Sequence, residues 1–362
     1  MKNAVETLLE SLNIVYIYNF QYFLSPSQLG YVCLPITSSS ISTKITSHVP
    51  VEPFKMPPYK VEPPTDCDVD FDPVQLADKT VIVTGGASGI GEAYVRALHK
   101  AGAKVVIGDK DSTAGERLAS ALPGTKFVQV DATLWEDQVR LFKEAVGFSS
   151  SGRIHYVIAN AGITKHDQTF TFDGEDKEPQ KPDLQTIDVN LKGTLYTAKL
   201  AMHYFVSQNG TQAQDNQEDT CLILVSSGAG FLDVPRGPEY SSTKWAVRGI
   251  MHALRRTTFY YGSRVNVIAP WYIRTGILSK EQFDQVEKSG VEFATAEDAG
   301  ECALRILSDS SVNGRTLFVC ARKWAARGYV DLDIEDYPHS PLIQEMQEDQ
   351  IKNAPVELGL YI

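Results

Sequence analysis

The stretch Thr80-Val-Ile-Val-Thr-Gly-Gly-Ala-Ser-Gly-Ile-Gly91 joins an apolar, β-branched run to a glycine-rich turn. The residues after this turn, from about 89 to 101, have the pattern of an amphipathic helix. A glycine-rich turn between a strand and a helix N-terminus lets backbone amides approach a pyrophosphate. The spacing of Gly85, Gly89 and Gly91 is G-x-x-x-G-x-G rather than the more common G-x-G-x-x-G. The stretch therefore predicts a dinucleotide cradle, with tight packing alone as the alternative interpretation.

Apolar strands continue to alternate with amphipathic helices beyond this turn. This alternation is typical of a parallel sheet covered by helices on both faces. We therefore predict an α/β fold with a single Rossmann-type, doubly wound domain and a seven-stranded parallel sheet flanked by helices. The predicted strands are residues 80–84, 104–108, 127–130, 156–159, 221–225, 264–268 and 315–319. Polar or turn residues follow almost every strand, which places ligand contacts at the carboxyl edge of the sheet.

A second informative feature is the pair Tyr240 and Lys244, thirteen and seventeen residues after Ser227. Four residues make about one helical turn, so both side chains leave the same face of a helix. A tyrosine with a reference pKa of about 10 needs roughly 3–4 kcal/mol of stabilisation to act as a base near neutrality. One ammonium about 4 Å away supplies up to ~4 kcal/mol at an effective dielectric constant of 20. The pair predicts proton transfer coupled to hydride transfer at a carbon that bears oxygen, with a surface contact as the alternative.

Asp109 directly follows the second predicted strand, 24 residues after Gly85. A carboxylate at this position accepts hydrogen bonds from the ribose hydroxyls of an adenosine and repels a 2'-phosphate. The residue therefore favours NAD as the cofactor. NADP remains open, because the neighbouring Lys110 could pair with a phosphate, and a solvated turn residue is the alternative interpretation of Asp109.

Composition excludes several classes of protein. The chain has 362 residues, 43% of them hydrophobic, and a formal net charge of -11 without a dense Lys/Arg run, so we expect a globular protein and no nucleic-acid partner. Five scattered cysteines without a Cys-x-x-Cys motif indicate reduced thiols and a reducing, cytoplasmic location. The seven histidines lack metal-ligand spacing, so no metal is expected.

The first 70 residues differ in composition from the rest of the chain. The apolar stretch 12–24 is interrupted by Asn13, Asn19 and Gln21 and is shorter than the roughly 20 residues of a membrane span, so none is predicted. A Ser/Thr-rich stretch at 37–47 and a proline-rich stretch at 50–64 indicate a linker. We expect 1–70 to be an N-terminal extension, poorly ordered or partly absent from a native protein that starts at Met56. The domain itself is predicted at 71–322, followed by a C-terminal tail at 323–362.

Six sequence elements together resemble the single-domain branch of the short-chain dehydrogenase/reductase family over residues 71–322. They are the turn at 84–91, Asn160-Ala-Gly162, Asp188-Val-Asn-Leu-Lys-Gly193, Ser226-Ser227, Tyr240-Ser-Ser-Thr-Lys244 and Arg264-Val-Asn-Val-Ile-Ala-Pro270. Within the family, the chain is similar to 15-hydroxyprostaglandin dehydrogenase-type enzymes and to fungal 5'-hydroxyaverantin dehydrogenase-type enzymes. The resemblance implies an oxidoreductase that transfers a hydride between a nicotinamide cofactor and a small hydrophobic secondary alcohol or ketone, in fungal secondary metabolism.

The resemblance also implies a catalytic set of Asn190, Ser227, Tyr240 and Lys244. Tyr240 would exchange the proton, Ser227 would orient the substrate oxygen, and Lys244 would acidify the phenol and bind ribose hydroxyls. The Asn190 region would hold a water that relays protons from Lys244. Two alternatives stay open: Ser226 competes with Ser227, and Asn190 could instead bridge two helix segments.

The implied cofactor contacts lie at the ends of the predicted strands and in the glycine turn. They are Gly85, Ser88, Gly89, Ile90, Gly91, Asp109, Asp131, Ala132, Asn160, Ala161, Gly162, Tyr240, Lys244, Pro270, Ile273 and Thr275. Asp131 could alternatively serve as a helix cap, and Asn160 could stabilise the sheet without touching the cofactor.

Substrate contacts are expected after the sixth strand, where Pro270 is followed by Trp271-Tyr-Ile-Arg-Thr275. We expect these aromatic side chains to narrow the pocket or to stack on an aromatic substrate. Residues 276–292 are predicted to form a mobile lid. An apolar wall is expected from Phe231, Leu232, Val234 and Pro235.

The family resemblance implies a homodimer or homotetramer, with the helix of Tyr240 and Lys244 at an interface. Trp245, Val247 and Ile250 would then be buried between subunits rather than in the monomer core. Three functions remain to be weighed: an NAD-dependent alcohol dehydrogenase, an NADPH-dependent ketone reductase with the same catalytic residues, and a non-enzymatic NAD(H)-sensing protein.

Overall fold

The computed structural model describes residues 59, 61–214, 216–337 and 339–353. The predicted linker, the apolar stretch 12–24 and the proposed start at Met56 lie outside these residues, apart from the end of the linker. Among the described residues, no helix combines the length and apolar character needed to cross a bilayer.

An eight-stranded sheet with the order β3-β2-β1-β4-β5-β6-β7-β8 forms the centre of the domain. Its strands are β1 (Thr80–Thr84), β2 (Lys104–Asp109), β3 (Thr125–Gln129), β4 (Tyr156–Ala159), β5 (Thr220–Val225), β6 (Ser263–Pro270), β7 (Thr316–Val319) and β8 (Tyr329–Asp331). The predicted seven parallel strands are confirmed. The eighth strand, β8, runs antiparallel to β7, with Leu317 opposite Asp331, and was not predicted.

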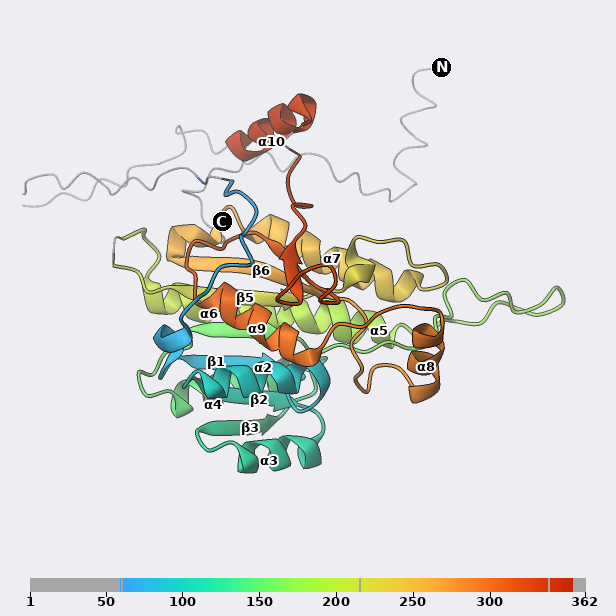
Figure 1. Ribbon diagram of the computed structural model, residues 1–362, viewed down its shortest axis with the longest axis horizontal. Helices are drawn as coiled ribbons and strands as arrows, with labels where there is room; N and C mark the ends of the chain where they lie inside the picture. Colours follow the sequence, from blue (N-terminus) through green and yellow to red (C-terminus); the bar gives the residue numbers. More distant parts are fainter. Residues whose placement is uncertain (1–58, 60, 215, 338, 354–362) are drawn as a thin grey trace, which may run out of the picture. The chain divides into compact units, whose positions relative to one another are not determined.

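The doubly wound arrangement follows from strands that are apolar on both faces. In β1, Val81 and Val83 face one hydrophobic core, and Ile82 faces the other. Helices α2, α3 and α9 pack on the first face and helices α4, α6 and α7 on the second (Figure 1). This burial of successive residues on opposite faces is expected for a parallel sheet between two helical layers.

The helices connect the strands in the order that the alternation predicts. They are α2 (Gly89–Lys100), α3 (Ser112–Ala121), α4 (Trp135–Phe148), α5 (Gln185–Ile187), α6 (Thr194–Asn209), α7 (Pro238–Leu254), α8 (Lys280–Lys288), α9 (Ala296–Leu307) and α10 (Pro341–Asn353). A π-helical segment, η3 (Asp188–Gly193), joins α5 to α6, and a 3-10 turn, η4 (Gly228–Gly230), follows β5.

Strand order reverses between β1 and β4, because β1 leads to β2 on one side while β4 continues on the other. Open parallel sheets bind ligands in the crevice outside the carboxyl ends of the strands at such a reversal. The glycine turn follows β1, and Asn160 follows β4 directly. The topology therefore brings these two motifs to one crevice.

Residues outside the predicted boundaries at 71 and 322 form buried contacts next to the sheet. The backbone amide of Thr65 donates to Asp331 Oδ2 at 2.9 Å. Asp331 also forms an ion pair with Arg315, with 2.7 Å between Arg315 Nε and Asp331 Oδ2. Glu335 is 1% exposed although it lies in the segment predicted as a tail. Long-range ion pairs of this kind leave no periodic pattern in the sequence. No sequence pattern therefore indicated that residues 331–335 pack on the domain.

Candidate active site

The glycine turn has the backbone conformation and the close packing that its composition suggests. Gly85 and Gly89 have φ values of +62° and +57°, in the left-handed region that favours glycine. A Cβ atom at Gly91 would lie 1.9 Å from the carbonyl oxygen of Gly85. The turn therefore requires glycine at all three positions, and it leads into the N-terminus of α2 at Gly89.

Asn160 holds this turn to the sheet. Its Nδ2 donates to the carbonyl oxygens of Thr84 at 3.0 Å and Gly85 at 2.9 Å. The side-chain amide is thus occupied by the protein itself, as in the structural alternative considered for this residue. Ala161 lies close beside the turn, because a Cβ at Gly85 would stand 2.8 Å from Ala161 Cα.

Asp109 lies at the end of β2 and supports the turn from the other side. Its Oδ2 accepts from the backbone amide of Ala87 at 2.9 Å, and its Oδ1 accepts from the amide of Asp111 at 3.0 Å. The carboxylate is only half-buried, so it remains accessible from the crevice. Thr275, from the loop after β6, also reaches this region, since a Cβ at Gly89 would lie 3.2 Å from Thr275 Cβ.

Asp131 forms a local turn before α4, whose N-cap is Leu134, so its side chain does not cap that helix. Its Oδ1 accepts from the amide of Thr133 at 2.9 Å and from the hydroxyl of Thr133 at 2.7 Å, and these bonds lower the pKa of Asp131. A cavity of about 420 Å³ lies beside it at the ends of β2 and β3. The cavity is lined by Lys110, Gln129, Asp131, Asp137 and Arg140.

These features fit a nicotinamide dinucleotide. The glycine positions leave room for the backbone to approach a pyrophosphate at the start of a twelve-residue helix. Asp109 offers a carboxylate for ribose hydroxyls, and the buried ammonium of Lys244 offers hydrogen-bond donors further along the crevice. Among the described residues, no group of three or more His, Cys, Asp or Glu side chains has the arrangement of a metal site.

The predicted catalytic residues converge at the carboxyl end of β5 and the start of α7. Lys244 Nζ lies 5.5 Å from the centroid of the Tyr240 ring and donates to the carbonyl oxygen of Val225 at 3.1 Å. Ser227, two residues after β5 ends with Val225, lies near enough to the Tyr240 side chain for its hydroxyl to lower the pKa of that tyrosine. The structure therefore brings Ser227, Tyr240 and Lys244 together.

The two neighbouring serines differ sharply in environment. Ser226 is 2% exposed, and its Oγ donates to the backbone carbonyl of Lys244 at 2.7 Å. Ser227 is half-buried, and its Oγ accepts from the amide of Ala229 at 3.2 Å. Because Ser226 is committed to the helix backbone, Ser227 is the serine that faces Tyr240.

The pKa shifts of Tyr240 and Lys244 differ from those expected from the sequence. Burial raises the pKa of Tyr240, against a smaller lowering by the hydrogen bond with Ser227 and a further increase from Tyr272. Burial also lowers the pKa of Lys244 to about 8. In the protein alone, both groups are thus shifted toward their neutral forms, and the expected lowering of the tyrosine pKa by the ammonium is not found.

Asn190 lies in the π-helical segment η3, and its side chain is 1% exposed. Its Oδ1 accepts from the amide of Ile163 at 2.8 Å, and its Nδ2 donates to the carbonyl of Ile163 at 2.9 Å. Its backbone carbonyl accepts from the Thr194 hydroxyl at 2.7 Å. Both ends of the amide are occupied, and they join η3 to Ile163 in the non-helical segment after β4.

An aromatic cluster surrounds the loop after β6. Trp271 packs edge-on against Tyr272 and Phe318, with ring centroids 5.0 Å and 6.1 Å apart. Phe318 also packs edge-on against Phe231 of the predicted apolar wall, at 5.3 Å. Tyr272 stacks on Phe293 at 6.0 Å. Sequence reasoning did not assign Phe293 or Phe318, because each comes from a distant segment and belongs to no motif.

The predicted lid at 276–292 contains α8, which is joined to the loop after β6 by ion pairs. Arg274 pairs with Asp284 at 3.1 Å and Glu287 at 2.7 Å, while its guanidinium lies 5.7 Å from the Phe283 ring centroid and 5.1 Å from that of Phe293. Within the predicted apolar wall, Leu232 and Val234 are 40% and 42% exposed.

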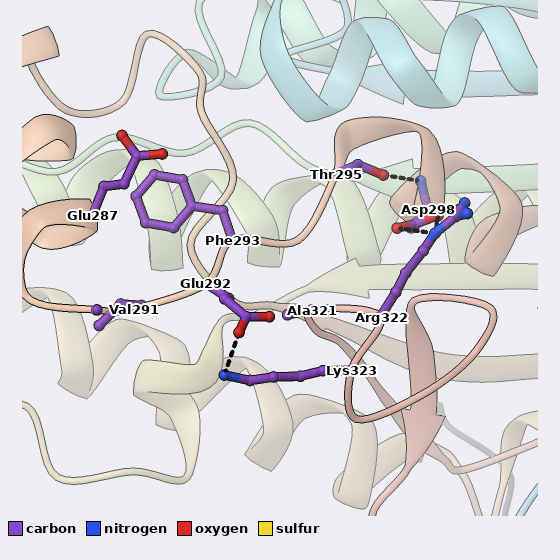
Figure 2. A pocket seen from close by; sticks show the side chains of 10 residues that line it. Glu287, Val291, Glu292, Phe293, Thr295, Asp298, Ala321, Arg322 and Lys323 are labelled. Carbon is purple, nitrogen blue, oxygen red and sulfur yellow. Dashed lines mark hydrogen bonds and ion pairs between the residues drawn. The ribbon is translucent and has the colours of Figure 1, made fainter.

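A cavity of about 490 Å³ is lined by the end of the predicted lid and by the segments around Asp298 and Arg322 (Figure 2). Four of its charged side chains form two ion pairs, Arg322 with Asp298 and Lys323 with Glu292. Tyr240, Lys244 and Ser227 are not among its lining residues. Phe293 is shared between this cavity and the aromatic cluster.

The fold and these residues define a nicotinamide-dinucleotide-binding α/β protein with an oxidoreductase site. A sequence profile described as short chain dehydrogenase matches residues 79–285. The chain belongs to the short-chain dehydrogenase/reductase family, as the six sequence elements indicated. It is an NAD(P)-dependent alcohol dehydrogenase or reductase.

Individual relatives agree with this assignment. The chain is 32% identical to 5'-hydroxyaverantin dehydrogenase from Dothistroma septosporum over 74% of this chain and 92% of the relative. It is 30% identical to NADP-dependent dehydrogenase M3 from a Phoma species, over 74% of this chain and 82% of the relative. A crystal structure of 3-ketoacyl-(acyl-carrier-protein) reductase from Brucella melitensis, complexed with NADH, shares the fold. Its TM-score is 0.58 at 24% identity, over 67% of this chain and 97% of that chain.

Proposed function

We propose that this protein is an NAD-dependent dehydrogenase of a hydrophobic secondary alcohol, or of the corresponding ketone in reverse, in fungal secondary metabolism. The observation that carries the proposal is the convergence of Ser227, Tyr240 and Lys244 beside the crevice where strand order reverses. The proposed catalytic residues are these three, with Asn190 as a fourth residue that shapes the site.

Bound nicotinamide would supply the hydride acceptor or donor of the reaction. In alcohol oxidation, the Tyr240 oxygen takes the proton of the substrate hydroxyl, and in ketone reduction it gives a proton to the forming alkoxide. Ser227 hydrogen-bonds the substrate oxygen and fixes its direction toward Tyr240. Lys244 carries hydrogen-bond donors that ribose hydroxyls can accept. In the protein alone it does not lower the pKa of Tyr240, so its ammonium would favour the phenolate only together with the positive charge of bound oxidised nicotinamide.

In this proposal the Asn190 side chain acts by binding the backbone of a neighbouring segment. Its side chain fixes Ile163, in the segment that follows β4, to the π-helical segment η3. It also donates to the Thr243 hydroxyl at 3.3 Å, next to Lys244 in the chain. The residue thus joins three segments around Lys244, and the proton relay is assigned to the region rather than to the amide itself.

The preference for NAD rests on Asp109, whose half-buried carboxylate stands at the end of β2. Charge-assisted hydrogen bonds of this type contribute about 1.5–3 kcal/mol, and a 2'-phosphate would meet like charge. A specific observation supports NADPH as the second candidate: Lys110 and Arg140 both line the cavity at this end of the crevice. The name of the Phoma relative includes dependence on NADP.

The substrate class is supported by the aromatic cluster. Trp271, Tyr272 and Phe231 give the region next to the predicted catalytic residues an apolar, ring-rich surface. The name of the Dothistroma relative points to the oxidation of an alcohol with the chemistry of 5'-hydroxyaverantin. A secondary alcohol or ketone attached to an aromatic framework satisfies both observations.

A homodimer or homotetramer through α7 remains part of the proposal, with one change. Val247 is 0% exposed within the single chain and packs in the monomer core with Ile250 beside it, so the expectation that they are buried between subunits was wrong for Val247. Trp245 is 50% exposed and is the residue of this set available to a second subunit. Four buried free thiols among the described residues support a reducing, cytoplasmic location.

A spectrophotometric screen tests the proposed function. Reduction of NAD and of NADP would be followed at matched concentrations with aromatic and alicyclic secondary alcohols, and the reverse reaction with the corresponding ketones. We expect turnover of at least one hydrophobic alcohol or ketone, with NAD(H) preferred. Preference for NADP(H) would select the reductase alternative, and binding of NADH without turnover of any alcohol or ketone would oppose the enzymatic proposal.

A further inference from the structure

Arg248 lies one helical turn beyond Lys244 on α7, and its side chain is 10% exposed. Its Nη1 donates to the carbonyl oxygen of Gly230 at 2.9 Å. Its Nε and Nη2 donate to the two carboxylate oxygens of Glu335 at 3.0 Å and 3.1 Å. One guanidinium therefore connects the loop after β5 to the C-terminal segment of the chain.

Gly230 belongs to the turn that presents Ser227. The turn η4 has Ser227 as its N-cap, and the amide of Gly230 donates to the carbonyl of Ser227 at 2.9 Å. A Cβ at Gly230 would lie 2.8 Å from the carbonyl oxygen of Lys244 and 2.4 Å from Ser226 Oγ. The turn is thus packed against α7 at Lys244 and is held through the Gly230 carbonyl by Arg248 of the same helix.

Glu335 is fully enclosed, with a side-chain exposure of 0%. Burial disfavours its charge, but hydrogen bonds from His252 and Arg248 lower the pKa of Glu335 to about 2. At the C-cap of α7, Arg255 donates to the Glu335 carbonyl at 3.2 Å and to Asp336 at 2.8 Å. The segment is therefore anchored to α7 at successive turns of the helix.

We propose that Arg248 and Glu335 are positioning residues that hold Ser227 against Tyr240, so that the segment 331–336 contributes to the active site from outside it. The inference rests on the proposed role of Ser227 in the reaction. Neither residue touches the reacting atoms. Arginine suits this position because its planar fork donates in several directions at once, which an ammonium on a flexible stem does not reproduce.

The same segment offers a matched control. Asp331 forms a comparable buried ion pair with Arg315, with Nε to Oδ2 at 2.7 Å and Nη2 to Oδ1 at 2.9 Å. This pair anchors β8 to β7 and has no contact with the turn at 228–230 among its hydrogen bonds. Asp331→Asn therefore removes a buried charge from the same segment without releasing Gly230.

The test compares the full-length variants Glu335→Gln, Arg248→Lys and Asp331→Asn. Arg248→Lys keeps a cation beside Glu335 and guards against a folding defect in the Gln variant. Amide hydrogen exchange of the peptide covering 226–232 is measured in each, together with thermal unfolding and the dissociation constant of NADH. Turnover is measured with the fastest substrate of the screen.

We expect exchange at the turn to rise about tenfold in Glu335→Gln and Arg248→Lys, with kcat lowered about tenfold and NADH affinity kept within twofold. Asp331→Asn should lower the melting temperature but leave both the amide exchange at the turn and kcat unchanged. Exchange at 226–232 that matches Asp331→Asn would overturn the inference even if no substrate were found. Faster exchange with unchanged kcat would also overturn it. Ser227→Ala tests the proposed catalytic role of Ser227 separately. If this variant loses activity, a negative result with Arg248 or Glu335 counts against the positioning inference alone.

Discussion

The ammonium nitrogen of Lys244 lies 5.5 Å from the centroid of the Tyr240 ring and is hydrogen-bonded to the Val225 carbonyl. Burial raises the pKa of Tyr240 and lowers that of Lys244, so it drives both groups toward neutrality. The protein therefore keeps a buried cation at a cost to stability. Such a cost is typical of a site organised for chemistry rather than for folding.

Lys244→Met is predicted to stabilise the cofactor-free protein while abolishing turnover. The pKa of Lys244 falls from an ordinary value of 10.5 to about 8, so keeping it charged below pH 8 costs about 3 kcal/mol. The variant also loses the hydrogen bond to the Val225 carbonyl, which costs it about 1 kcal/mol of stability. Urea unfolding at pH 7 should show the variant about 2 kcal/mol more stable than the wild type.

The sign of the pH dependence provides the check. Between pH 8 and 10.5 the unfolded lysine stays protonated while the folded one does not, so the wild type recovers stability as pH rises. The advantage of Lys244→Met should therefore shrink over this window. A variant that is less stable than the wild type at pH 7 would show that the buried ammonium is well compensated.

Ser227→Ala and Ser226→Ala should separate catalysis from stability at adjacent positions. Loss of the Ser227 hydroxyl is expected to lower kcat about 100-fold or more, because it removes a hydrogen bond to the developing charge. Ser226→Ala should leave kcat within a few-fold and cost about 1–2 kcal/mol of stability, because the Lys244 carbonyl loses its buried donor. Steady-state kinetics and urea unfolding measure both, and the reverse pattern would assign catalysis to Ser226.

Asp109→Asn should shift the cofactor preference toward NADPH by about tenfold or more. The amide keeps an oxygen that can accept from Ala87, so the turn is preserved while the negative charge is removed. Fluorescence titration with NADH and NADPH measures the ratio of the two dissociation constants. Lys110→Ala is the matched control and should weaken NADPH alone. An unchanged ratio in Asp109→Asn would locate cofactor selection elsewhere.

The sequence predicted the central part of the fold closely. The first and fourth strands, 80–84 and 156–159, have the predicted ends because turn residues follow them directly. Strand β8 was missed because it has three residues and its identity depends on pairing with β7. Likewise, the spacing of Tyr240 and Lys244 predicted their proximity, whereas the direction of the tyrosine pKa shift depends on burial, which spacing does not encode.

For the site, motifs indicated individual residues, whereas contacts between distant segments could not be predicted. The family resemblance implied Ser227 and left Ser226 as a competitor, and the hydrogen bond from Ser226 to the helix backbone favours Ser227. The contact between Arg248 and Glu335 joins positions 87 residues apart and could not be seen in any local pattern. The stacking of Tyr272 on Phe293 is similarly nonlocal, although Tyr272 lies within the aromatic stretch that the sequence singled out.

Turnover of Tyr240→Phe tests the central claim most directly. The substitution removes one oxygen from a ring that stays packed, with Tyr272→Phe as the control for loss of a neighbouring phenol. We predict that Tyr240→Phe binds NADH within about twofold of the wild-type affinity and loses at least about 100-fold in kcat, while Tyr272→Phe keeps most of its activity. Wild-type kcat in Tyr240→Phe, at an unchanged NADH affinity, would contradict proton transfer by this tyrosine.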